Sequence, residues 1–163
     1  MTWLKKLVKT LHFLEDAILV IIFLSLMALA FTQIGLRNFF DGGWVWADSA
    51  LRILVLWLAM WGASVASRHN HHIRIELAPY YLPKSWQRFN TILCDLACAI
   101  ISGVVAYYSF QFVTEEYSQG GIAFAHIPVW VCESIIPVSL TILAFRFSAQ
   151  TLATVLRAEE VLE

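Results

Sequence analysis

The chain has 163 residues, of which 60% are hydrophobic and 14% are charged, and its mean hydropathy is +0.69. A water-soluble domain of this size needs far more polar surface to cover its core, so a soluble globular protein is the least favoured class. The formal net charge of −1 and the lack of a basic patch give no basis for a nucleic-acid partner. The composition instead predicts an all-α integral membrane protein.

The first membrane helix is expected over residues 13–37. Its apolar run, Ala17 to Leu36, follows a segment, Met1 to His12, in which three lysines alternate with apolar residues. Such alternation is typical of an amphipathic segment on a membrane surface. A basic start before an apolar run also suits a secretory signal peptide. However, Glu15 and Asp16 interrupt that pattern and the apolar run continues beyond the possible cleavage site, so we favour an uncleaved helix.

The segment from Trp44 to Ile73 supplies the second helix, expected over residues 45–68. A helix rises about 1.5 Å per residue, so the roughly 20 residues from Asp48 onward span about 30 Å, the thickness of the hydrocarbon core. Asp48 and Arg52 lie one helical turn apart near the start of this span. Ionisable side chains are costly there, which points to a specific role for them.

Two further helices are expected over residues 91–113 and 122–147, which makes four spanning helices in a single domain over the whole chain. The linker 69–90 contains two prolines that act as breakers, and part of it alternates apolar and polar residues like a second interfacial segment. A polar turn over 115–121 ends in two glycines before the fourth helix.

The distribution of basic residues predicts the orientation of the helices. Loops on the cytoplasmic side of a membrane carry an excess of Lys and Arg. The N-terminus, the middle linker and the C-terminal tail together hold Lys5, Lys6, Lys9, Arg68, Arg74, Lys84, Arg88, Arg146 and Arg157. The other two connections hold only Arg37. Both chain ends, with the amphipathic segments, are therefore expected on the cytoplasmic side.

Arg52 and Glu133 are the charged residues predicted to lie within the membrane near its outer boundary. By rise per residue they lie about 6 Å and about 9 Å inside that boundary, on the second and fourth helices. We expect a structural ion pair between them, with Asp48 at i−4 as the competing partner of Arg52. A proton relay is less favoured because no second intramembrane carboxylate lies nearby, and a hydrogen bond or salt bridge to a partner protein is the third alternative.

At the opposite boundary, Glu15, Asp16 and Asp95 lie close in depth to Arg68 and Arg74. We expect these side chains to be solvated or paired at the interface.

Trp57 and Trp61 lie one turn apart in the middle of the second helix, whereas tryptophan usually prefers membrane interfaces. Mid-membrane tryptophans either face lipid or form a packing ridge for another protein. Gly62 and Ala66 form a pair of small residues on the same helix, a spacing that favours close helix contact. We predict that these four residues contribute to a partner interface.

The histidines do not predict a haem or metal site. His69, His71 and His72 lie at the inner boundary and His126 at the outer one, about 25 to 30 Å apart, so they cannot share a haem. Loop histidines without a carboxylate or cysteine partner make a weak metal site. With no nucleophile–base constellation either, no cofactor and no enzymatic activity are expected.

The chain resembles the small membrane subunit, of DctQ type, of tripartite ATP-independent periplasmic (TRAP) transporters. The resemblance is carried by Arg37-Asn38-Phe39-Phe40, Trp46-Ala47-Asp48, Arg52, Trp57, Gly62-Ala63, Ala66-x-Arg68 and His72-Ile73-Arg74-Ile75. That family commonly reads W-x-E-E at the start of the second helix and G-A-x-x-A-x-R-x-x-x-H-I-x-V-D at its end. Here Asp48 replaces a Glu and Glu76 replaces the Asp, both conservative departures.

The resemblance implies a non-catalytic scaffold and anchor in sodium-driven uptake of organic acids, either C4-dicarboxylates or sialic acid, across the bacterial inner membrane. It also implies two partners, a large multi-helix membrane subunit and, transiently, a periplasmic substrate-binding protein. We expect Glu115 and Glu116 to contact the periplasmic protein.

Two alternatives remain open from the residues alone. One is a small self-assembling, proton-coupled exporter, for which Glu133 is the only suitable carboxylate. The other is a membrane anchor subunit of a redox enzyme.

Overall fold

The computed structural model describes residues 2–40, 42–68, 84–124 and 126–159. The helices are α1 (Thr2–Phe40), α2 (Val45–Ala66), α4 (Lys84–Gln119), α5 (Val129–Glu133) and α6 (Ile135–Glu159), and the short strands are β1 (Ile122–Phe124) and β2 (Ile127–Pro128). Four segments are long and apolar enough to cross a membrane: Lys9–Phe39, Val45–Ala66, Asn90–Gln119 and Val129–Val155. The predicted all-α fold with four spanning helices is confirmed.

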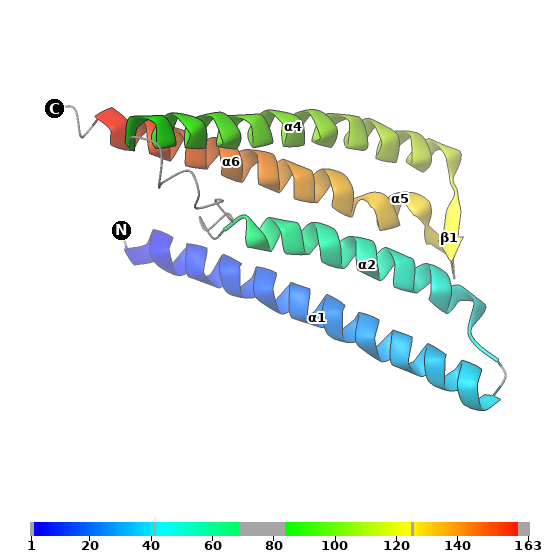
Figure 1. The fold of residues 1–163 in the computed structure, drawn as a ribbon. Helices are drawn as coiled ribbons and strands as arrows, with labels where there is room; N and C mark the ends of the chain where they lie inside the picture. The colour runs from blue at the N-terminus through cyan, green and yellow to red at the C-terminus, as the bar shows by residue number, and fades with distance from the viewer. Residues whose placement is uncertain (1, 41, 69–83, 125, 160–163) are drawn as a thin grey trace.

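The long helices lie in a row in the order α4, α6, α2, α1 (Figure 1). α4 packs along α6, α6 packs against α2, and α2 packs against α1. Among the residues whose burial the structure describes, half of the eight buried hydrophobic ones are alanines (Ala47, Ala50, Ala99 and Ala106), so the helix backbones approach each other closely. Most large apolar side chains remain on the outside, which in a membrane is the surface available to lipid or to another protein.

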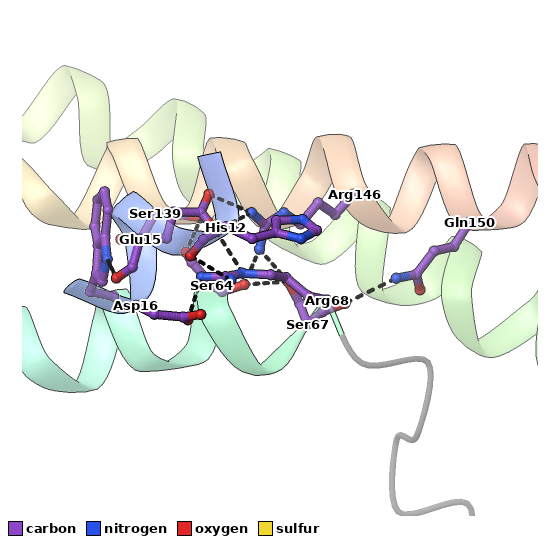
Figure 2. A network of polar contacts seen from close by, with 10 residues as sticks. His12, Glu15, Asp16, Ser64, Ser67, Arg68, Ser139, Arg146 and Gln150 are labelled. Carbon is purple, nitrogen blue, oxygen red and sulfur yellow. Dashed lines mark hydrogen bonds and ion pairs between the residues drawn. The ribbon is translucent and has the colours of Figure 1, made fainter. Parts of the chain in front are cut away.

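α1 begins and α6 ends at the same end of this row, called here the terminal end, where the side chain of Arg68 also lies (Figures 1 and 2). The opposite, distal end holds the connection from α1 to α2 and the two strands. The predicted N-terminal amphipathic segment is not a separate element, because it continues into α1 as one helix of 39 residues. The second predicted interfacial segment, within 69–83, lies outside the described residues.

The prediction that the fourth helix begins at residue 122 is wrong. Ile122–Phe124 and Ile127–Pro128 instead form the antiparallel pair β1–β2. Gly120, with a φ of 67°, ends α4, and the Val129 N–H donates to the carbonyl of Gly121 at 3.0 Å. Pro128 lacks an N–H and has an extended conformation, so the helix can begin only after it. Hydropathy alone did not separate this apolar hairpin from a helix.

The fourth spanning segment is divided into α5 and α6 at Ser134. Pro137 explains the break, because it lacks the N–H that would bond the carbonyl of Glu133 and its ring crowds that carbonyl. The side-chain hydroxyl of Ser134 donates to the carbonyl of Val131 at 2.7 Å, which satisfies a carbonyl beside the break.

Gln33 fixes the turn from α1 to α2 at the distal end. Its side chain is 4% exposed, its Nε2 donates to the carbonyl of Trp44 at 3.2 Å, and its Oε1 accepts from the N–H of Trp44 at 3.2 Å. A Cβ atom on Gly43 would lie 2.9 Å from Gln33 Nε2, so any larger residue would have to displace this amide. The turn is thereby held by one buried side chain.

Candidate functional site

The carboxylate of Glu15 on α1 lies between two guanidinium groups that come from other helices (Figure 2). Its Oε1 lies 2.6 Å from Nη2 of Arg146 on α6, and its Oε2 lies 2.6 Å from Nε of Arg68, just beyond α2. Arg146 Nη2 also donates to Oε2 at 2.9 Å, so the contact is bidentate on the carboxylate side. One acidic side chain therefore joins three helices.

Arg68 is the most buried charge of this group, with a side chain only 5% exposed. Besides Glu15, its guanidinium pairs with Asp16 Oδ1 at 3.0 Å and donates from Nη1 to the carbonyl of His12 at 3.0 Å. Two arginines therefore face two carboxylates, and the cluster is neutral. Removing such a charge from water strongly destabilises the folded state unless the charge is paired in this way. Glu15, Asp16, Arg68 and Arg146 are called the inter-helix clamp below.

Arg146 and Gln150 extend the clamp by capping the C-terminus of α2. The carbonyls of the last helical turn lack backbone donors and carry the negative end of the helix dipole. Arg146 Nη1 donates to the carbonyl of Ser64 and, at 3.2 Å, to the hydroxyl of Ser67. Gln150 Nε2 donates to the carbonyl of Ser67 at 3.0 Å. Two side chains of α6 thus satisfy the end of α2.

Trp57 and Trp61 add two ties along the same row. The Trp57 Nε1–H donates to the carbonyl of Cys132 in α5 at 2.9 Å. The Trp61 Nε1–H donates to the carbonyl of Glu15 in α1 at 3.1 Å. Because a buried indole N–H needs an acceptor, these bonds fix α2 to its neighbours on both sides.

The clamp is suited to holding helices rather than to transforming a substrate. Its guanidinium and carboxylate groups pair with each other, and a guanidinium group also donates to a backbone carbonyl. Within the described ranges, no group of three or more His, Cys, Asp or Glu side chains is placed to bind a metal ion. His69, His71 and His72 lie outside the described residues, whereas His126 is exposed and lies between β1 and β2.

The predicted ion pair between Arg52 and Glu133 is wrong. Arg52 is exposed, and no ion pair of the described part of the chain includes it. At about 100° per residue, Arg52 lies about 140° around α2 from Trp57, the residue that faces α5. Glu133 retains one buried carboxylate oxygen without a hydrogen-bond partner among the described residues. Similar depth was not sufficient, because the two side chains leave their helices on different faces.

Asp48, the predicted local partner of Arg52, pairs with Arg37 instead. The Arg37 Nη2 to Asp48 Oδ2 distance is 2.7 Å, and both side chains are largely exposed. The tight turn held by Gln33 brings the end of α1 beside the start of α2, which places these two residues together. An exposed pair of this kind contributes only about 0–1 kcal/mol to stability.

Of the four predicted partner-interface residues, three have contacts within the chain. Trp57 and Trp61 bond to α5 and α1, as described. A Cβ atom on Gly62 would lie 3.7 Å from Leu19, so this glycine faces α1. Ala66 is exposed and remains a candidate for contact with a partner.

Glu115 and Glu116 lie in the last turns of α4 at the distal end, because that helix continues beyond its predicted end. Glu115 is exposed and Glu116 is half-buried. Glu116 Oε2 would lie 3.6 Å from a Cβ atom on Gly121, which places it against the turn into β1.

Sequence reasoning found part of the clamp and missed the rest. Equal depth already placed Glu15 and Asp16 near Arg68, although as solvated or interfacial charges. From the sequence, Arg146 is expected only as one of the basic residues of the C-terminal tail. The signal that identifies it is the spacing of Ser139, Arg146 and Gln150, which at i, i+7 and i+11 share one face of a helix.

Glu15→Gln is expected to destabilise the folded chain by about 3 kcal/mol, because it leaves Arg68 and Arg146 with one carboxylate between them. Thermal unfolding of the detergent-solubilised protein measures the change. Glu115→Gln, an exposed glutamate on α4, is the matched control and should shift the melting temperature little. Equal shifts for both variants would contradict a structural role of the clamp.

Comparison with known proteins identifies the family. Residues 26–158 match the model of the family described as "Tripartite ATP-independent periplasmic transporters, DctQ component". The C4-dicarboxylate TRAP transporter small permease protein DctQ of Rhodobacter capsulatus is 29% identical over 63% of this chain and 46% of its own length. The chain thus matches less than half of that relative.

Two relatives are named for sialic acid. The small permease protein SiaQ of Vibrio cholerae is 23% identical over 66% of this chain and 62% of its own length. The permease protein SiaT of Haemophilus influenzae is 22% identical over 88% of this chain but only 23% of its own length. The family match covers most of the chain, and the four apolar helices agree with it. This chain belongs to the DctQ family of small permease components of TRAP transporters.

Proposed function

We propose that the chain is the scaffold and membrane anchor of the large transport subunit in a sodium-driven TRAP system that takes up organic acids. The observation that carries this proposal is the inter-helix clamp, which joins α1, α2 and α6 through Glu15. A neutral cluster of paired charges resists rearrangement, because moving one helix leaves buried charges unpaired. Such a chain supports a moving partner better than it moves substrate itself.

The row of helices leaves a wide apolar surface for the membrane. Exposed large apolar side chains extend along α1 and α4, among them Phe31, Ile34, Ile101 and Tyr108, and this surface suits a membrane anchor. The SiaT relationship supports a larger neighbour, since a segment like this chain makes up 23% of a longer permease polypeptide. TRAP small permeases pair with large permease subunits, and we assign this chain the same kind of partner.

The family is one of inner-membrane proteins, and this chain is a multi-pass member of it. We further propose that the terminal end of the row faces the cytoplasm. Three N-terminal lysines and both clamp arginines are associated with that end, which the positive-inside rule assigns to the cytoplasm. The distal end, with Glu115 and β1, then faces the periplasm.

The names of the relatives support an organic acid as substrate. C4-dicarboxylates and sialic acid are the compounds in the names of the proteins described above, and both are carboxylates. The choice between these classes belongs to the large subunit and the binding protein, because the clamp has no free basic group to offer a carboxylate.

Capture of the tagged chain from its native membranes in mild detergent tests this proposal. We expect a very hydrophobic multi-helix protein to be recovered with it at close to one-to-one ratio, identified by mass spectrometry. Sodium-dependent uptake of a labelled dicarboxylate or sialic acid should then require both proteins in liposomes.

Recovery of the chain alone or as a homo-oligomer, with transport lost on Glu133→Gln, would contradict the scaffold proposal and favour a small exporter. A haem or quinone spectrum in the purified protein would favour a redox anchor instead.

We propose that Glu115 and Glu116 guide the transient docking of a periplasmic substrate-binding protein. Their position at the distal end of α4 supports this role. Reversing both charges to lysine should slow uptake at low ionic strength by about tenfold, because charge complementarity acts mainly on association. The binding protein's affinity for the reconstituted complex measures docking. Unchanged uptake and affinity would rule out the contact. The same variant at high ionic strength, where the difference from the unaltered chain should vanish, serves as the control.

A further inference from the structure

One face of α2 is exposed from Arg52 to the end of the helix. Arg52, Val55, Ala59, Ala63 and Ala66 are exposed, whereas every other position from 53 to 65 is half-buried or buried. Their spacing of three or four residues places all five on a single face, since a helix repeats every 3.6 residues. These five residues are called the α2 stripe.

The α2 stripe differs in side-chain size from the other outward surfaces. The exposed positions of α1 and α4 are dominated by large side chains such as Ile21, Leu24, Phe31, Ile100 and Ile101. Beyond Arg52, the α2 stripe consists of one valine and three alanines. Small residues permit the backbone of another helix to approach closely, an advantage that lipid chains do not need. The α2 stripe is therefore a surface against which another helix can pack closely.

Arg52 adds a positive charge to the α2 stripe. It lies seven residues after the start of the span at Val45, about 10 Å along the helix axis. No ion pair among the described residues includes it, and the nearby Asp48 is taken by Arg37. An unpaired guanidinium at this depth is costly in lipid, and a carboxylate is its best geometric match.

We propose that a membrane helix of the large TRAP subunit docks along the α2 stripe and that a carboxylate on this helix pairs with Arg52. The proposal rests on the proposed function, because it names the surface through which the scaffold holds its partner. Charge complementarity at Arg52 and the narrow stripe of alanines both favour a protein helix over a lipid. A phospholipid phosphate is the competing occupant.

A photo-crosslinking amino acid placed at three exposed alanines tests the location. Ala63 lies on the α2 stripe, while Ala28 on α1 and Ala97 on α4 are matched controls of the same size and exposure class. After irradiation of native membranes, Ala63 should give an adduct with the large subunit at about five times the yield of either control. A lipid adduct alone at Ala63, or equal yields at all three positions, would overturn the assignment.

Capture of the large subunit tests the charge. Arg52→Gln should reduce recovery of the large subunit about tenfold, while Arg52→Lys should retain at least half. Lys9→Gln, which removes an exposed basic residue on α1, is the control and should leave recovery unchanged. Full recovery with Arg52→Gln would reject the carboxylate pair.

The two proposals fail in different ways. If the unaltered chain recovers no large subunit, the proposed function fails. If the unaltered chain recovers it and the Ala63 and Arg52 variants behave like their controls, only the docking surface is wrong.

Discussion

The pairing of Glu15 with two arginines is the constraint on which the helix row depends. Arg68 is nearly excluded from water and Arg146 reaches backbone carbonyls of α2, so both require a carboxylate at one place. That place is fixed on α1, which otherwise packs mainly against α2. The neighbouring residues Ser64 and Ser67 are buried and small, which allows α6 to come close enough for Arg146 to reach across.

This constraint links the geometry of the row to its role in transport. Each inner helix of the row packs against a neighbour on two sides, so its remaining surface is available to the membrane or to a partner. The clamp and the indole bonds of Trp57 and Trp61 hold the neighbours together without a compact bundle core. The result is a broad apolar wall with little interior, which suits a subunit that flanks and supports a larger membrane protein.

The number and nature of the spanning helices follow directly from the sequence, because apolar runs of the right length have few alternatives in a membrane. The boundaries were less predictable. The segment 122–128 is as apolar in sequence as a helix, yet Ile122–Phe124 and Ile127–Pro128 pair as strands between a glycine with positive φ and the start of α5 after Pro128. Hydropathy reports burial in lipid and carries no information on local backbone conformation.

The side-chain pairs show a second limit. Depth in the membrane placed Arg52 beside Glu133, but a pair also needs matching faces, and the face of α2 toward α5 is the one with Trp57. The pairing of Arg37 with Asp48 depends on the turn built by Gln33, which no periodicity reveals. Conversely, the spacing of the polar residues along α6 does predict the polar face that contains Arg146. The position of a side chain around its helix is therefore as important as its depth in the membrane for predicting such pairs.

A rigid scaffold has a measurable signature during transport. Spin labels at the exposed positions Phe13 on α1 and Phe145 on α6, in a variant without native cysteines, would report the distance between two helices joined by the clamp. In the reconstituted complex, double electron–electron resonance should give one narrow distance distribution that is the same without sodium and with sodium plus substrate. A distribution that shifts or splits when sodium and substrate are added would show that the small subunit moves with the transport cycle and would contradict the scaffold role.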